Sequence, residues 1–237
     1  MVRPREFDRD DALNKAMRLF WEHGFDQTSI SQLTEGMGIS SPSLYAAFGD
    51  KRRLFEDAVE CYEAGPTAVA RRAMAADTAT EVFDAMMDLA VTEYCRPGNP
   101  KGCMVISDAA CAAQRGRCRD TIAVRFRKAL KAGDLPQGTD PRAMANYTFA
   151  VLTGLSAFAR DGATRRQLRA TADVARQGWE AQLAVAAQTT VSQRSVTPSA
   201  SVGGRRPDLN ARAGSTARQV SPFPEPPGID TAQRSAT

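Results

Sequence analysis

Hydroxyl and ammonium groups gather near the start of the chain, at a spacing that could serve contact with a polyanion. Residues 28–55 read TSISQLTEGMGISSPSLYAAFGDKRRLF. The hydroxyls of Ser41, Ser43 and Tyr45 can donate hydrogen bonds to phosphate oxygens or to base edges. Lys51 lies where a further helix should begin, and both its charge and the free backbone N–H groups there favour a phosphate. These residue types indicate contact with DNA.

The elements that must position these groups are two short helices around a turn. In the first helix, Leu33 and Met37 recur at helical spacing and are expected to face the core. Thr28 is expected to cap this helix, which should begin at Ser29. Gly38 follows the helix and supplies the permissive backbone that a sharp exit requires.

The second short helix carries most of the candidate donors. Ser40 or Ser41 is expected to cap it, and Leu44 and Phe48 are expected to face inward because they lie four residues apart. Tyr45 is then left on the outer face. This arrangement is typical of a helix-turn-helix, which presents one helix to the major groove. The same spacing also occurs in helical packing units that bind no nucleic acid.

The expected reading helix contains no arginine, asparagine or glutamine over residues 41–48. Bidentate base contacts are therefore not expected there, and direct readout should be modest, with help from DNA shape. Residues 1–55 carry equal numbers of basic and acidic side chains. This balance argues against nonspecific coating of nucleic acid and is compatible with a site-specific interaction.

The stretch resembles the DNA-binding domain of TetR/AcrR-type transcriptional regulators. The resemblance rests on Thr28-Ser29, LTEGMGIS at 33–40, Ser43-Leu44-Tyr45, Phe48, Lys51 and Leu54-Phe55. It implies phosphate contacts from both flanks, by Thr28 with Ser29 on one side and by Lys51 on the other. It also implies groove and backbone contacts by Ser40, Ser41, Ser43 and Tyr45.

The chain as a whole is expected to be all-α, with three parts. A helix-turn-helix domain is expected over 6–66 and a helical domain over 67–187. A disordered tail is expected over 188–237, where the composition shifts to Ser, Thr, Pro, Gly and Arg. Within the middle part, helices are expected over 67–75, from 80, over 103–113 and 121–131, from 140, and over 164–187.

Bulk properties exclude several other classes of protein. The chain has 237 residues, of which 43% are apolar, enough for a buried core. It has no apolar run of about 18 residues and no apolar N-terminal stretch, so a cytoplasmic protein without membrane association is expected. The five cysteines form no CxxC pair and there is one histidine, so neither a zinc site nor a disulfide framework is expected. Walker, GxGxxG and GxSxG motifs are absent from the sequence, so neither an enzyme nor a cofactor is expected.

The resemblance implies that the middle part binds an unidentified small-molecule effector and that its last two helices pair with a second copy. Candidate cavity residues are Met86, Met87, Met104, Phe126, Tyr147 and Phe149, each of which ordinary core packing also explains. An alternative is a thiol or soft-metal sensor built on Cys103, Cys111 or Cys118. In that alternative, the neighbouring arginines 115, 117 and 119 are expected to lower the pKa of Cys118.

The expectation is therefore a homodimeric repressor that binds a palindromic double-stranded DNA operator and is released by its effector. A helical interaction module without DNA binding is the other alternative. The sequence determines neither the operator, nor the effector, nor the sign of regulation.

Overall fold

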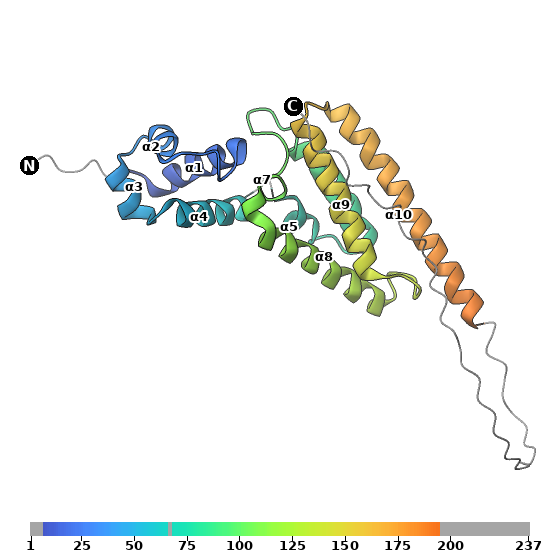
Figure 1. Ribbon diagram of the computed structural model, residues 1–237. Coiled ribbons are helices and arrows are strands. Elements are labelled where there is room, and N and C mark those ends of the chain that lie inside the picture. Colours follow the sequence, from blue (N-terminus) through green and yellow to red (C-terminus); the bar gives the residue numbers. More distant parts are fainter. Residues whose placement is uncertain (1–6, 66–67, 195–237) are drawn as a thin grey trace, which may run out of the picture. The chain divides into compact units, whose positions relative to one another are not determined.

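The computed structural model describes residues 7–65 and 68–194, and over these ranges all regular structure is helical (Figure 1). The helices are α1 (Arg9–His23), α2 (Ile30–Met37), α3 (Ser41–Phe48), α4 (Lys51–Ala64), α5 (Val69–Ala73), α6 (Ala79–Glu93), α7 (Met104–Ser107), the 3-10 turn η1 (Ala109–Cys111), α8 (Ala112–Ala132), α9 (Pro141–Arg160) and α10 (Arg165–Arg194). The expected all-α fold is confirmed.

Helices α1 to α4 share one apolar core. Helix α1 begins where the Asp8 carboxylate accepts hydrogen bonds from the backbone N–H groups of Asp10 and Asp11. Phe20 of α1 meets Phe55 of α4 edge to face, with ring centroids 5.1 Å apart. Helices α1 and α4 are thereby fixed as the support on which α2 and α3 pack.

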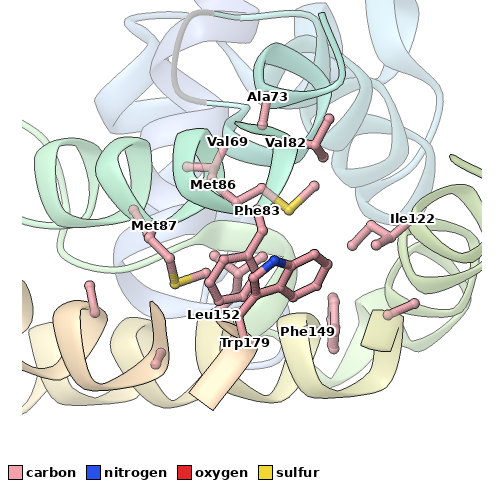
Figure 2. Close-up of a cluster of buried hydrophobic side chains, with 14 of the residues drawn as sticks. Val69, Ala73, Val82, Phe83, Met86, Met87, Ile122, Phe149, Leu152 and Trp179 are labelled. Carbon is pink, nitrogen blue, oxygen red and sulfur yellow. The ribbon is translucent and has the colours of Figure 1, made fainter. Parts of the chain in front are cut away.

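Helices α5, α6, α8, α9 and α10 enclose a second core around Trp179 of α10, shown in Figure 2. Its ring stacks on Phe83 of α6 at a centroid distance of 4.5 Å and lies 5.1 Å from Phe126 of α8. The indole N–H donates to the hydroxyl of Thr80 at 3.1 Å. The polar edge of this large buried ring is therefore satisfied.

The segment over 103–113 differs from the single helix that was expected. Helix α7 ends at Ser107, because Asp108 has an extended backbone and its carboxylate accepts the N–H of Ala110 at 2.8 Å. Helix α8 then begins at Ala112, well before the expected start at 121. Arg115 stabilises this early start by donating to the carbonyls of Val105 and Asp108.

Helix α7 is held against α9 by a close backbone approach. The N–H of Cys103 donates to Ser156 Oγ at 2.9 Å. Gly102 has a φ of +74°, and a Cβ there would lie 2.8 Å from the Ser156 carbonyl oxygen. Glycine therefore suits this position for two reasons: it adopts a positive φ without strain, and it has no Cβ to collide with Ser156.

Two other helix boundaries also differ from expectation. Helix α5 covers only Val69–Ala73, while residues 66–67 lie outside the described ranges. Helix α10 continues to Arg194, past the expected end at 187. The remainder of the predicted tail, 195–237, lies outside the described residues. None of the helices in the described ranges has the length and apolar character that crossing a membrane requires.

Candidate nucleic-acid interface

Helix α2 begins with a reciprocal cap that differs in one residue from the expectation. Ser29, rather than Thr28, is the N-cap. Its Oγ accepts the N–H of Gln32 at 3.2 Å, while the Gln32 side chain accepts the N–H of Ser29 at 2.7 Å. This capping box satisfies two of the free N–H groups at the start of α2.

Unlike the other candidate residues, Thr28 is buried in the structure. Its side chain is fully buried, and its hydroxyl donates to the Gly24 carbonyl oxygen at 2.7 Å. The hydroxyl thus stabilises the turn between α1 and α2. A phosphate contact through this hydroxyl would require that turn to open.

The turn between α2 and α3 has the geometry expected from its glycine. Gly38 has a left-handed backbone, with φ of +73°, and its N–H donates to carbonyl oxygens near the end of α2. Ser40 is the N-cap of α3, since its Oγ accepts the N–H of Ser43 at 3.3 Å. Pro42 lies in the first turn, where its missing N–H costs nothing.

Helix α3 has one buried and one exposed face. Leu44 and Phe48 are buried, as expected. On the other side the Tyr45 side chain is 50% exposed, and Ser41 and Ala46 are exposed beside it. Helix α3 therefore presents small and hydroxyl-bearing side chains to an approaching groove.

The hydroxyls near α3 differ in how far the protein itself uses them. Those of Ser40 and Ser43 lie 2.8 Å apart and hydrogen-bond to each other. Within the described ranges, the hydroxyls of Ser41 and Tyr45 have no such partner. Ser41 and Tyr45 are consequently the donors best placed to contact DNA.

Lys51 stands at the start of α4, directly after the N-cap Asp50. Its ammonium lies 4.5 Å from the centroid of the Phe25 ring, which fixes the long side chain against the α1–α2 turn. The Asp50 carboxylate accepts the N–H of Arg53 at 2.8 Å. A phosphate at this helix end would therefore bind through the Lys51 ammonium rather than through that N–H group.

A cavity of about 460 Å³ lies among the end of α4 and the helices of the second domain. Its walls come from α4 to α9, and its lining is mostly apolar. Burial raises the pKa values of Tyr62 and Tyr94 well above the usual range, so both lining hydroxyls remain protonated donors. Of the six candidate lining residues only Phe149 reaches this cavity. Met86, Met87 and Phe126 are buried core, as is Met104 in the first core, and Tyr147 packs against the second core.

Comparisons with known proteins agree with this geometry. Residues 12–58 match the profile of the bacterial regulatory proteins of the tetR family. The chain is 30% identical over 192 residues to the HTH-type transcriptional repressor ComR of Escherichia coli K12, spanning 75% of this chain and 91% of ComR. The repressor BdcR of the same organism is 34% identical over 182 residues, or 73% of this chain and 89% of BdcR.

The chain belongs to the TetR family.

A solved structure of this family is also similar along most of the chain. It is a cysteine mutant of the TetR family transcriptional regulator CifR, complexed with a 26-bp double-strand operator DNA. It is 35% identical, with a TM-score of 0.70, and the match covers 75% of this chain and all of CifR. The TetR-type arrangement of an N-terminal helix-turn-helix domain followed by a helical domain is thus shown for this chain.

The cysteines of this TetR-family chain do not have the setting expected for a sensor. Cys103 and Cys118 line the cavity, whereas Cys111 is buried in the first core. Burial raises the pKa of Cys118 to about 12, and the pKa of Cys111 likewise. The expectation that neighbouring arginines lower the pKa of Cys118 is therefore wrong, because burial outweighs the opposing effect of Arg119. Within the described ranges, no group of cysteine, histidine and acidic residues could hold a metal ion.

The sequence reasoning missed Asp108, which connects the two domains. Its Oδ2 accepts the backbone N–H of Phe25 at 2.7 Å, in the turn before α2. Met104, Val105 and Cys111, which flank Asp108, pack into the core of the first domain. An aspartate directly before a helical segment is a recognisable N-cap signal, but nothing local indicates its distant partner.

Proposed function

We propose that this protein is a cytoplasmic transcriptional repressor that binds palindromic operator DNA as a homodimer. The single observation that carries the proposal is the exposed face of α3, where the Tyr45 and Ser41 hydroxyls have no hydrogen-bond partner within the described ranges. Lys51 follows at the start of the next helix, α4. Ser29, Ser40 and Ser43 are proposed as further contacts around this face. The operator complex of CifR and the repressor activity in the names of ComR and BdcR support the same reading.

The proposed domain organisation places DNA binding in 6–66 and the effector and dimer functions in 67–187. The exposed faces of α9 and α10 support dimer formation. Phe158 is 41% exposed on α9, and Val174 and Val185 are 66% and 57% exposed on α10. Large apolar side chains at such exposure favour a partner helix pair, and a second copy supplies one with two-fold symmetry.

Release by a small-molecule effector is proposed to work through the segment 103–111. Val105 both lines the cavity and packs in the first core, and Asp108 holds the turn before α2. A ligand that displaces α7 would therefore move the support of the reading helix. A ligand can shift this equilibrium only if it binds more tightly to one of the two positions of α7, the original or the displaced one.

A thiol sensor is a weaker candidate on the same scaffold. Cys103 and Cys118 would meet a ligand in the cavity, but burial raises the pKa values of both thiols. The thiolate, which is the reactive form, is therefore disfavoured. No catalytic activity is proposed for the chain.

Selection of binding sites from random double-stranded fragments tests the proposed function. Enrichment of a palindromic sequence is expected, together with reduced transcription in vitro from a promoter that overlaps the selected site. A purified, folded dimer that enriches no sequence would contradict the proposal and favour a helical interaction module.

A further inference from the structure

The α8 side of the cavity carries a row of polar residues. Gln114, Arg117, Cys118 and Thr121 all line it from α8, at the spacing of a single helix face. The facing walls carry Val69, Met74, Phe149 and Leu152. A ligand that fits both sides must be amphiphilic, with an apolar body and a polar group near α8.

Three charged residues line the cavity, but only one of the two cations is free to bind a ligand. Arg71 donates to the carbonyl oxygens of Glu63 and Ala64, at 2.9 and 2.5 Å, so its guanidinium already serves the end of α4. The Arg117 guanidinium makes no hydrogen bond or ion pair within the described part of the chain. It therefore offers donors to whatever occupies the cavity.

Among the described residues, Glu63 is the only acidic one in the lining. Burial raises its pKa, and the nearby Arg117 acts against this rise without reversing it. A second guanidinium, that of Arg119, lies 5.7 Å from the ring centroid of Phe149, another lining residue. The balance of charge at the cavity thus favours an anion over a cation.

A further polar atom of the α8 face lacks a partner. The Oε1 atom of Gln114 is buried without a hydrogen-bond donor within the described ranges. An acceptor left in this state costs free energy that only a donor can recover. An ionised carboxylate has no donor, so Gln114 Oε1 does not itself select an acid, and the choice of ligand class depends on Arg117. The two free groups, Gln114 and Arg117, lie about one turn apart on α8.

We infer that the cavity binds an organic acid with an apolar body, whose carboxylate pairs with Arg117 and whose tail fills the space between α5, α7 and α9. A guanidinium can donate two parallel hydrogen bonds to a carboxylate, which neither an alcohol nor an amine can accept in the same way. The inference rests on the proposed function, because it names the chemical class of the effector for the cavity assigned there.

Calorimetric titration of the full chain with octanoate, 1-octanol and octylamine tests the inference. These probes share an apolar tail and differ in the head group. Octanoate is expected to bind about 10-fold or more tightly than 1-octanol, the difference that one charge-assisted pair supplies. Arg117→Gln is expected to abolish this preference. Arg127→Gln is the matched control, since Arg127 is exposed on the same helix and is not part of the lining.

A second variant removes the negative charge at the cavity instead of the positive one. Glu63→Gln removes the competing carboxylate, so octanoate should bind at least as tightly as to the wild type. The inference is overturned if octanoate shows no preference over 1-octanol, if Arg117→Gln keeps the preference, if Glu63→Gln weakens octanoate binding, or if none of the probes binds.

Operator binding, measured on the same samples without probes, separates this inference from the proposed function. If the protein binds its selected operator but shows no preference for octanoate, only the inference about the effector class is contradicted. If the protein binds octanoate through Arg117 but enriches no operator, the proposed function is contradicted instead.

Discussion

At the scale of single residues, the candidate interface depends on a few side chains whose polar groups have no hydrogen-bond partner within the described ranges. Lys51 is fixed over Phe25 at 4.5 Å, so its ammonium has a defined position before DNA arrives. Such preorganisation reduces the entropy lost on binding. A contact of this kind is sequence-independent and sensitive to salt.

Replacing Lys51 with glutamine should therefore weaken operator binding by about 1 kcal/mol, or about fivefold, for every DNA sequence alike. The slope of log affinity against log salt should fall by about one. Fluorescence anisotropy across a salt series measures both quantities. Lys128→Gln, an exposed position on α8, is the control, and an equal loss in both variants would deny Lys51 a specific phosphate contact.

The buried thiols lead to a prediction about pH. Because burial raises the pKa of Cys118 to about 12, very little thiolate is present near pH 8. Alkylation by iodoacetamide should be much slower than for a small free thiol and should accelerate as the pH rises toward that value. Peptide mass spectrometry follows the labelling. Rapid modification of Cys118 at pH 7 would restore the thiol-sensor alternative.

At the scale of the elements, the short helix α5 depends on an ion-pair cluster with α6. Glu93 is almost fully buried, and its carboxylate accepts hydrogen bonds from Arg96 at 2.6 and 2.7 Å and from Arg72 of α5 at 2.9 Å. These contacts, those of Arg96 first, lower the pKa of Glu93 below its usual 4.5. The carboxylate is therefore stabilised in its charged form.

The consequence is a dependence of stability on pH. The stabilisation from Glu93 is complete above pH 4.5 and declines as the pH falls through its lowered pKa. Glu93→Gln should lower the free energy of unfolding by about 1–3 kcal/mol at pH 7 and remove part of the decline below pH 4.5. Urea unfolding at several pH values measures this. An unchanged acid dependence in the variant would show that other carboxylates control it.

The two domains differ in how far the sequence predicts their elements. The capping residues Ser40 and Gly38 and the inward pair Leu44 and Phe48 follow local rules, so most of the helix-turn-helix could be predicted. The N-cap of α2 was the exception, because Thr28 is buried and its hydroxyl donates to the Gly24 carbonyl oxygen, which leaves Ser29 as the cap. The early start of α8 could not, because Arg115 stabilises it by reaching back to the carbonyls of the preceding segment. Local signals do not reveal such a partner.

The cavity could not be predicted for a related reason. Its lining comes from α4 to α9, so no single periodic stretch identifies it. Apolar residues that line it and apolar residues that fill the core have the same spacing, as the pair Phe149 and Phe126 illustrates. Only the packing of the helices decides which of them borders empty space.

At the scale of the whole molecule, function requires two reading helices at a fixed separation, because a two-fold dimer contacts two half-sites. The exposed apolar residues of α9 and α10 are the surface proposed to set that separation. Their burial between two copies would remove an apolar area that is otherwise exposed to water.

A charge placed on this surface should dissociate the dimer. Val174 is 66% exposed in the single chain, so Val174→Glu should leave the fold intact and yield a monomer in size-exclusion chromatography with light scattering. Operator affinity should drop at least tenfold, because each monomer contacts only one half-site. Val124→Glu, which alters an apolar residue 44% exposed on α8, should remain dimeric. If both variants remain dimeric, the dimer interface does not include Val174.

The most direct test of the central claim is the binding of the wild type and of Tyr45→Ala to the selected operator, with excess competitor DNA present. The wild type should bind saturably, resist the competitor and weaken as salt rises. Tyr45→Ala should remain a folded dimer, since the side chain is half exposed, and should lose about 1–2 kcal/mol of binding free energy. Equal affinity of the two proteins for the operator would contradict recognition through the exposed face of α3.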